Sequence, residues 1–270
     1  MKTALITGAS SGIGEATAKQ LLKEGYTVYV AARRVARMKS LEEAGARAIA
    51  MDITDHAQVE AAVRQINEEA GGVDVLVNNA GFGMYGAMED TSIDDARYQF
   101  EVNIFGLARL TQLVLPHMRA QGAGKIVNIS SMGGKVYTPL GSWYHATKHA
   151  LEGWSDCLRL ELEPFGIDVI VIEPGLIKTE FGDVMVGPML ERSGEGPYAA
   201  LTQKLAEATR KSYASGSGSP ASLIAAVISK ALRAKKPRTR YVAGQFARPS
   251  ILIRKIFGDR TFDRIVMSQL

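Results

Sequence analysis

Tyr144 and Lys148 lie four residues apart, and Ser131 lies thirteen residues before the tyrosine. If this stretch is helical, positions i and i+4 share one face, so the lysine ammonium can approach the phenol. A free phenol has a pKa of about 10, which makes it a weak acid for proton transfer at neutral pH. A neighbouring cation stabilises the phenolate and lowers that pKa. The three residue types therefore predict a proton-transfer site with Tyr144 as the acid.

A glycine-rich turn predicts a second site near the start of the chain. Residues Lys2–Thr7 form a short apolar run, and Glu15–Glu24 have a helical pattern. Backbone N–H groups and the helix dipole at such a strand–helix turn favour phosphate. The glycine spacing is looser than G-x-G-x-x-G, so a plain strand–helix turn is the alternative. The turn residues that would bind a phosphate are Gly8, Ser10, Ser11, Gly12, Ile13 and Gly14.

Together these residues resemble the classical short-chain dehydrogenase/reductase family, most closely its 17β-hydroxysteroid and retinol dehydrogenase branch. The resemblance covers roughly residues 1–245. Further matches follow in the family's order, namely Asn78-Asn79-Ala80-Gly81, Asn103, Ser131, Tyr144, Lys148 and Pro174-Gly175.

The resemblance implies a catalytic role for four residues. Ser131 would hydrogen-bond the substrate carbonyl oxygen, and Tyr144 would donate the proton that this oxygen needs when a hydride reaches its carbon. Lys148 would tune Tyr144 and hold the nicotinamide ribose. Asn103 would anchor a water that links Lys148 to solvent.

The residues after the second predicted strand favour NADP(H) over NAD. An NAD site needs a carboxylate there for the ribose hydroxyls, whereas this chain has Arg33 and Arg34. A guanidinium can bind a 2′-phosphate through paired charge-assisted bonds. The alternative is that both arginines are solvated loop charges. By resemblance, the remaining cofactor contacts are Asp52, Ile53, Asn79, Ala80, Gly81, Tyr144, Lys148, Pro174, Gly175 and Thr179.

The predicted substrate pocket is mostly apolar or aromatic, which suits a lipophilic carbonyl compound, although ordinary packing would look the same. Its predicted members are Ser131, Met132, Tyr137, Tyr144, Met185 and Met189. The expected activity is NADP(H)-dependent interconversion of a carbonyl and a primary or secondary alcohol. A ketosteroid, a retinoid, a lipid or an aromatic ketone would fit as substrate.

Strand-like runs alternate with helical patterns, which predicts an α/β fold with one doubly wound parallel sheet. The resemblance gives the strand order 3-2-1-4-5-6-7 and helices on both faces. The predicted strands are Lys2–Thr7, Tyr26–Ala31, Arg47–Met51, Val73–Asn78, Lys125–Ser130, Asp168–Glu173 and Arg240–Ala243.

We expect residues 1–270 to form a single Rossmann-type domain. Residues 176–218, here called the flap segment, are expected to cover the substrate. Residues 245–270, here called the C-terminal extension, are basic. After the flap segment, Ser219 and Pro220 predict a helix start, with Ser219 as the N-cap.

Composition sets limits on location and partners. The net charge of the 270 residues is only +4, too small to imply nucleic-acid binding. No apolar run approaches the roughly 18 residues of a membrane-spanning helix. We expect no secretory signal at the start of the chain. With Cys157 as the sole cysteine, a reducing, cytoplasmic setting is expected. Cys157 itself is expected to fill the core, and no set of metal ligands is expected.

The sequence leaves three hypotheses for the function of the chain. The first is a carbonyl reductase that forms homodimers or homotetramers, as family members commonly do. The second is a non-catalytic NADP(H)-sensing or scaffold protein on the same fold. The third is a peripheral membrane enzyme, because basic and apolar residues are interleaved in the C-terminal extension. A helix packed on the body or on a partner subunit, with its charges solvated, is the favoured explanation of that extension.

Overall fold

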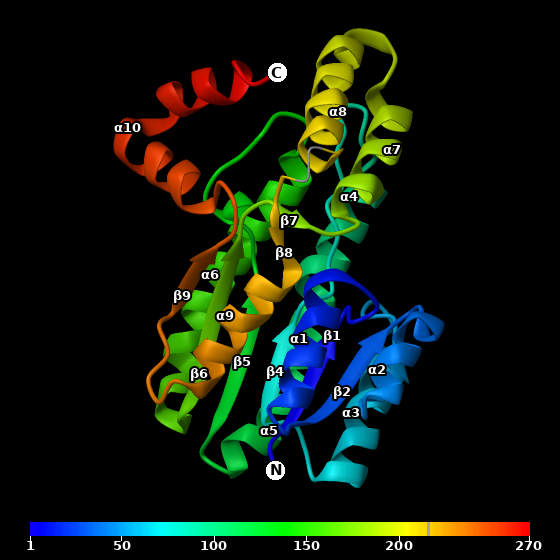
Figure 1. Ribbon diagram of the computed structural model, residues 1–270, viewed down its shortest axis with the longest axis vertical. Helices are drawn as coiled ribbons and strands as arrows, with labels where there is room; N and C mark the ends of the chain where they lie inside the picture. Colours follow the sequence, from blue (N-terminus) through cyan, green and yellow to red (C-terminus); the bar gives the residue numbers. More distant parts are fainter. Residues whose placement is uncertain (215–216) are drawn as a thin grey trace.

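The computed structural model describes residues 1–214 and 217–270. Seven parallel strands form the main sheet in the order β3-β2-β1-β4-β5-β6-β9 (Figure 1). The predicted strands and their order are confirmed, and no strand end differs from its prediction by more than two residues. The strands are β1 (Thr3–Thr7), β2 (Thr27–Ala32), β3 (Arg47–Ala50), β4 (Val75–Asn78), β5 (Gly124–Ile129), β6 (Ile167–Pro174) and β9 (Arg240–Ala243).

Helices connect these strands. The α-helices are α1 (Gly12–Lys23), α2 (Lys39–Glu43), α3 (His56–Ala70), α4 (Ile93–Phe100), α5 (Gly106–Ala120), α6 (Ser142–Leu162), α7 (Phe181–Ser193), α8 (Ala199–Ala214), α9 (Ala221–Arg233) and α10 (Ala247–Met267). The short helical turns are η1 (Val35–Met38), η2 (Glu101–Phe105), η3 (Met132–Gly134), η4 (Glu163–Phe165) and η5 (Gly196–Tyr198).

Both faces of the sheet are covered because its strands are apolar on both sides. In β1, Ala4 and Ile6 pack with α1, α2 and α9, whereas Leu5 packs with α3, α5 and α6. Alternate residues of a strand point to opposite faces, so a run with no polar residue fills two cores at once. Figure 1 shows α1 and α9 crossing one of these faces.

The carboxyl ends of the central strands converge at one edge of the sheet. β1 pairs with β4, β4 with β5, and β5 with β6, all in parallel. The loops that follow these strands therefore meet at one edge, where ligands bind in open α/β sheets. This geometry brings together strand ends as far apart in the chain as Thr7 and Pro174.

The flap segment is mostly helical and lies over that edge. It contains β7 (Ile177–Lys178), α7, η5 and α8, and α7 and α8 rise together beyond the sheet (Figure 1). Two of its residues, Ser215 and Gly216, lie outside the described part of the chain.

The predicted helix start at Ser219 is wrong. Ser219–Pro220 form the short strand β8, which pairs with β7, and the Ser219 N–H donates to the carbonyl oxygen of Leu176. Helix α9 begins at Ala221, with Pro220 as its N-cap residue and no side-chain cap. The strand pairing therefore prevails over the local capping preference.

The C-terminal extension forms α10, which leaves the sheet after β9 (Figure 1). Gly258 interrupts it with φ 74° and ψ 177°, a conformation that is essentially restricted to glycine. Within residues 1–214 and 217–270, no helix is both long enough and apolar enough to cross a membrane.

The predicted core position of Cys157 is also wrong, because its side chain is exposed on α6. Helix α6 buries the face that carries Tyr144, Lys148, Leu151 and Leu158. Residue 157 lies away from that face, although it is next to Leu158 in sequence.

Candidate active site

Lys148 is fixed against the end of β5. Its side chain is buried, and its Nζ donates to the carbonyl oxygen of Ile129, the last residue of that strand, at 2.9 Å. Ser131 follows two residues later, so this bond joins α6 to the strand end that carries the serine. Burial lowers the pKa of Lys148 to about 8, and the nearby Glu152 carboxylate opposes that shift.

Tyr144 lies in an aromatic enclosure. Its ring centroid is 5.8 Å from that of Tyr85 and 5.6 Å from that of Phe181, and the residue is 7% exposed. Burial raises the pKa of Tyr144, and a hydrogen bond with Ser131 opposes the rise. The expectation that Lys148 lowers this pKa is therefore wrong for the net shift. The Lys148 ammonium lies 6.0 Å from the ring centroid, and burial is the largest cause of the shift.

Asn103 lies in η2, a π-helical turn between α4 and α5. Its Nδ2 donates to the carbonyl oxygen of Phe82 at 3.1 Å and to Thr147 Oγ1 at 3.0 Å. A Cβ at residue 81 would lie 3.0 Å from Asn103 Oδ1 and 3.9 Å from Lys148 Nζ. Asn103, Gly81 and Lys148 are thus close neighbours, as the predicted catalytic set requires.

The glycine-rich turn is tightly packed against the end of β4. Gly8 and Gly12 have φ of 64° and 59°, which glycine adopts without strain. A Cβ at residue 14 would lie 2.5 Å from the Gly8 carbonyl oxygen, so no side chain fits there. Asn79 Nδ2 donates to the carbonyl oxygens of Thr7 and Gly8, which fixes the start of the turn.

Two other predicted cofactor residues border this turn. The Ala80 N–H donates to Thr7 Oγ1 at 3.0 Å. A Cβ at residue 12 would lie 3.0 Å from Thr179 Cγ2. Thr179, which follows β6 in the chain, therefore lies beside the turn that follows β1. The structure thus brings the predicted phosphate and nicotinamide contacts to one edge.

The predicted selectivity residues lie at the end of β2. Arg33 is exposed, donates to the Tyr98 hydroxyl at 3.1 Å and lies 3.9 Å from Asp52. Arg34 donates to Ser10 Oγ at 3.3 Å. Ser10 and Asp52 were themselves predicted cofactor contacts, so this group is brought together.

Sequence reasoning missed two residues of this group. Arg37 pairs with Glu180 at 2.9 Å, and Arg34 lies 3.6 Å from the same carboxylate. Arg37 belongs to the basic run that begins at Arg33, which was a usable signal. Glu180 lies 143 residues away from Arg37 at the start of α7, and no local pattern points to it.

The remaining predicted cofactor residues take part in backbone hydrogen bonds or pack in the core. The Ser11 carbonyl accepts from Glu15 N–H in the first turn of α1, and Ile13 packs on the core. Ile53 is buried with its carbonyl against Gly106. Pro174 ends β6, and the N–H of Gly175 donates to the Ala243 carbonyl at 2.8 Å.

The predicted substrate residues separate into two places. Met185 and Met189 of α7 are buried in one apolar cluster with Tyr144, and Met132 is partly exposed in η3 beside Ser131. Tyr137 instead packs against α10, where its hydroxyl donates to Asp263 Oδ1 at 2.9 Å. Sequence reasoning also missed Phe181, which contacts the Tyr144 ring directly.

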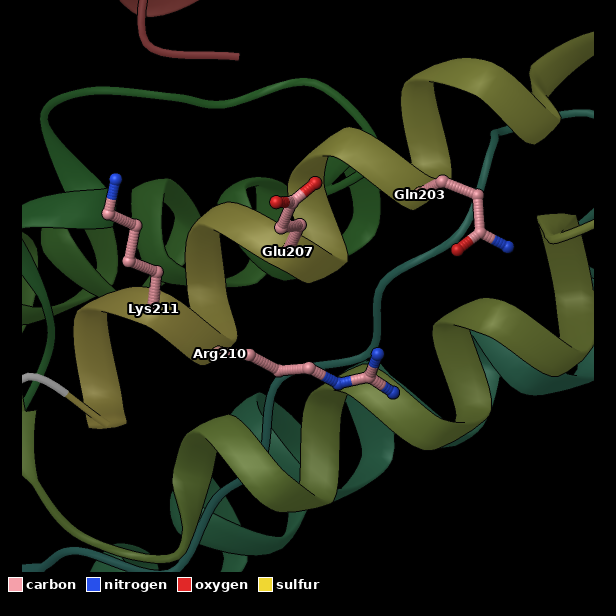
Figure 2. A pocket seen from close by; sticks show the side chains of 4 residues that line it. All are labelled: Gln203, Glu207, Arg210 and Lys211. Atoms are coloured by element: carbon pink, nitrogen blue, oxygen red, sulfur yellow. The ribbon is translucent and has the colours of Figure 1, made fainter.

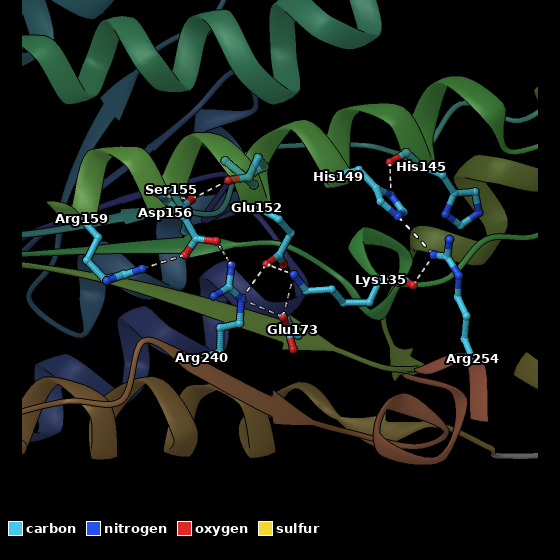
Figure 3. A network of polar contacts seen from close by, with 12 residues as sticks. Lys135, His145, His149, Glu152, Ser155, Asp156, Arg159, Glu173, Arg240 and Arg254 are labelled. Carbon is cyan, nitrogen blue, oxygen red and sulfur yellow. Dashed lines mark hydrogen bonds and ion pairs between the residues drawn. The ribbon is translucent and has the colours of Figure 1, made fainter. Parts of the chain in front are cut away.

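A charged network occupies the second half of α6 and the strands beside it (Figure 3). Glu152 is bound by Lys135 and by Arg240, each at 2.9 Å, and Arg240 also pairs with Asp156 at 2.7 Å. Glu173 of β6 lies 3.4 Å from Arg240 Nε. Burial and the Glu152 carboxylate raise the pKa of Glu173 to about 7.

Two hollows lie on the helices of the flap segment, away from these polar groups. One of about 510 Å³ is lined by exposed polar side chains of α8, namely Gln203, Glu207, Arg210 and Lys211 (Figure 2). The other, of about 260 Å³, lies between α7 and α8 beside Tyr213. Neither is lined by Ser131, Tyr144 or Lys148. In the described part of the chain, no three His, Cys, Asp or Glu side chains are grouped to hold a metal ion.

Comparison with known proteins agrees with this geometry. A family model described as short chain dehydrogenase matches residues 2–186. The 3-ketodihydrosphingosine reductase of Bacteroides thetaiotaomicron is 43% identical over 180 residues, which are 66% of this chain and 65% of that protein. This chain therefore matches less than two thirds of that relative's length. The NADPH-dependent 3-dehydrocapnine reductase of Ornithobacterium rhinotracheale is 34% identical over 291 residues, covering 100% of this chain and 98% of that protein.

Solved structures show the same likeness. A short-chain dehydrogenase from Streptomyces avermitilis is 36% identical with a TM-score of 0.81, covering 95% of this chain and 92% of that one. A serine dehydrogenase complexed with NADP+ is 26% identical with a TM-score of 0.78, covering 90% of this chain and 94% of that one.

Proposed function

Because this chain belongs to the short-chain dehydrogenase/reductase family, we propose that it is an NADP(H)-dependent carbonyl reductase whose substrate is a lipophilic ketone. One observation carries the proposal. Tyr144 is buried, hydrogen-bonds Ser131 and has the Lys148 ammonium beside its ring, at the sheet edge that also carries the glycine-rich turn. This is the arrangement that proton donation to a carbonyl oxygen requires.

In the proposed mechanism, the bound cofactor supplies the hydride that reaches the carbonyl carbon. Ser131 Oγ donates a hydrogen bond to the carbonyl oxygen and stabilises the negative charge that develops there. Tyr144 holds a proton on its hydroxyl, because burial raises its pKa, and transfers it to that oxygen. Lys148 keeps a positive charge near the phenol while that proton leaves.

Re-protonation of Tyr144 needs a route to solvent. Asn103 is held by Phe82 and Thr147, and its neighbour Gly81 is exposed and carries no side chain. We assign to Asn103 the role of fixing a proton path between Lys148 and the surface at this point. Met185 and Met189 contribute the apolar wall that excludes other water.

The chain's own residues fit a nicotinamide cofactor, and family membership supports one. The turn leaves no room for a side chain at Gly8 or Gly14, so its backbone can approach a diphosphate closely. For NADP(H) in particular, the support is the pair of exposed guanidinium groups of Arg33 and Arg34, with no carboxylate in their place at the end of β2.

For the substrate, we infer a long-chain lipid ketone. Two relatives are named for reductions of 3-keto sphingoid or capnine compounds, and the buried methionines beside Tyr144 offer an apolar wall. Ketosteroids, retinal and aromatic ketones are the other members of the lipophilic class. We also propose a cytoplasmic enzyme that forms homodimers or homotetramers and meets membranes only peripherally.

An NADPH-oxidation screen tests the reaction. We expect turnover with a 3-keto sphingoid base, measured as the loss of NADPH absorbance. Turnover with a ketosteroid, retinal or an aromatic ketone should be much slower. Formation of the alcohol is verified by mass spectrometry. NADPH binding without reduction of any of the four classes would instead support the scaffold reading.

The cofactor choice is tested by Arg33→Asp. Each charge-assisted bond to the 2′-phosphate is worth roughly 1.5–3 kcal/mol, so NADPH affinity should fall about ten- to hundredfold while NADH affinity rises. Fluorescence titration with both cofactors measures the change. The matched control is Arg64→Asp, an exposed arginine on α3, which should leave both affinities unchanged. Unchanged NADPH affinity in Arg33→Asp would refute the assignment.

A further inference from the structure

Helix α10 has an inner side that holds the loop after η3. Arg254 donates to the carbonyl oxygen of Lys135, and its guanidinium lies 4.5 Å from the Tyr137 ring centroid. The Phe262 and Tyr137 rings pack edge to face with their centroids 5.4 Å apart, and Asp263 accepts a hydrogen bond from the Tyr137 hydroxyl. Ser131 directly precedes η3 and lies four residues before Lys135, so α10 is tied to the chain segment that carries a proposed catalytic residue.

The outer side of α10 is apolar and unusually exposed. Leu252, Ile256 and Phe257 are 56%, 62% and 62% exposed, and the first two lie one helical turn apart. Exposed cations lie along the same part of the helix at Arg248 and Lys255, and exposed Arg260 follows the interruption at Gly258. Among the residues that the structure describes, none of these three cations has an ion-pair partner.

The acidic residues of α10 are directed to other contacts. Asp259 pairs with Arg254 at 3.2 Å, and Asp263 accepts the hydroxyl of Tyr137. The C-terminal extension contains five Arg or Lys residues and two Asp residues, so it carries a net charge of +3. Because both carboxylates are engaged with Arg254 and Tyr137, the flanks of the apolar stripe are cationic.

We propose that α10 is an interfacial helix whose outer side docks on an anionic lipid bilayer. Leu252, Ile256 and Phe257 would enter the boundary between headgroups and acyl chains, and Arg248, Lys255 and Arg260 would contact lipid phosphates. The straight part before Gly258 spans eleven residues, or about 16 Å, which is half the roughly 30 Å of a hydrocarbon core. The helix therefore lies in the surface and does not cross the bilayer.

Charge selects the bilayer over a second copy of the chain. In a two-fold dimer through this stripe, the same patch would face itself and place like charges opposite one another. An anionic membrane offers apolar and negatively charged groups together, which match both features of the outer side.

Docking in this orientation would bring the segment that follows Ser131 toward the lipid surface. The inner side of α10 holds Tyr137, so the loop from Ser131 to Tyr137 would follow the helix to the membrane. This consequence rests on the proposed function, because it matters only if the substrate is a lipid ketone.

Vesicle co-sedimentation tests the docking without using activity. We expect the protein to sediment with vesicles of phosphatidylglycerol and phosphatidylcholine, weakly with phosphatidylcholine alone, and less as salt is raised. A double variant with Leu252→Asp and Ile256→Asp should bind the anionic vesicles at least about tenfold more weakly. The control is Leu160→Asp, which changes an equally exposed leucine on α6 and should bind as the parent does.

A second variant, which changes charge only, tests the docking even if the Leu252→Asp and Ile256→Asp variant misfolds. Arg248→Glu with Lys255→Glu keeps the apolar stripe and should also lose binding to anionic vesicles, with an unchanged thermal transition. The proposal is overturned if the parent does not sediment, if it binds both vesicle types equally, or if the variants change only the oligomeric state in light scattering. Reduction of a water-soluble ketone by the double variant should be unchanged. If vesicles bind but no ketone is reduced, the docking stands and the proposed function fails.

Discussion

The two halves of α6 bury polar groups in opposite ways. In the first half, Lys148 is buried with a single hydrogen bond to a backbone carbonyl, and Tyr144 is surrounded by rings. In the second half, Glu152 and Asp156 face Lys135 and Arg240, so the charges are paired (Figure 3). A pairing of this kind stabilises the ionised forms, whereas burial without a counter-charge disfavours them, so it lowers the pKa of Lys148 to about 8 and raises the pKa of Tyr144. The difference separates the proposed proton-transfer site from a charged network that holds elements together.

The two halves of α6 are not electrostatically independent. Glu173 has a pKa raised to about 7 although two cations lie nearby, because burial and the Glu152 carboxylate both disfavour its charge. The Glu152 carboxylate also opposes the effect of burial, which lowers the pKa of Lys148. The paired half thus exerts an electrostatic effect on the first half, and the following predictions test how far the two are separate.

The largest expected effect is that of Tyr144→Phe. Without the proton donor, kcat should fall about a thousandfold, or about 4 kcal/mol in activation free energy, while NADPH still binds. Steady-state kinetics and fluorescence titration measure the two quantities. Tyr26→Phe is the matched control, since Tyr26 lies beside α1 before β2, at the opposite end of the sheet. Turnover close to that of the parent would show that another group supplies the proton.

Arg240→Met should act on stability and leave catalysis unaffected. The change leaves Glu152 and Glu173 buried with one cation fewer, which should lower the free energy of unfolding by about 3 kcal/mol. Urea denaturation measures the loss, with Arg64→Met on the surface of α3 as the control. A large fall in kcat at unchanged stability would contradict the separation of the two halves.

The rate of ketone reduction should depend on pH through Lys148. As pH rises through its pKa of about 8, the ammonium loses the proton that keeps the site positive beside Tyr144. Reduction consumes a proton, so kcat/KM should be constant below pH 8 and fall about tenfold per unit above it. A pH–rate profile measures this, and a flat profile between pH 7 and about 9.5 would refute the role of Lys148.

The smallest expected effect concerns Glu173→Gln. The folded-state pKa is raised from 4.5 to about 7, so the folded chain holds this proton more tightly than the unfolded chain does. The resulting stabilisation is fully present below pH 4.5 and is lost as pH rises through about 7. The variant should abolish this fall, so that its free energy of unfolding no longer decreases between pH 4.5 and about 7 for this reason. Equal slopes for parent and variant would contradict the shift.

Much of the fold is predictable because local sequence determines it. Apolar runs such as Val75–Val77 suit a strand covered on both faces, and the seven predicted strands follow from such runs. The turn glycines and the Tyr144–Lys148 spacing are also local, because each depends on residues a few positions apart. The structure brings these residues to the same sheet edge.

The errors arise where distant segments meet. The burial that raises the pKa of Tyr144 includes Phe181, which lies 37 positions later in the chain. The contact of Tyr137 with Asp263 joins residues 126 positions apart, and it places the Tyr137 hydroxyl against α10. No periodicity within either segment encodes such a contact. The predicted domain division and the roles of the individual site residues remain predictions.

The π turn at Glu101–Phe105 has a consequence for the length of this part of the chain. An α-helix advances about 100° per residue, so a wider turn shifts the angular position of everything after it. Leu110 and Val114 of α5 face the sheet, while Asn103 reaches back to Phe82. Loss of one residue within the turn would restore regular α geometry and rotate one of these groups out of place. The chain would then keep either the contact of Asn103 with Phe82 or the packing of α5 on the sheet. We therefore expect a single-residue deletion in this turn to destabilise the fold. Substitution of a side chain on the same turn, as at exposed Phe105, should be tolerated.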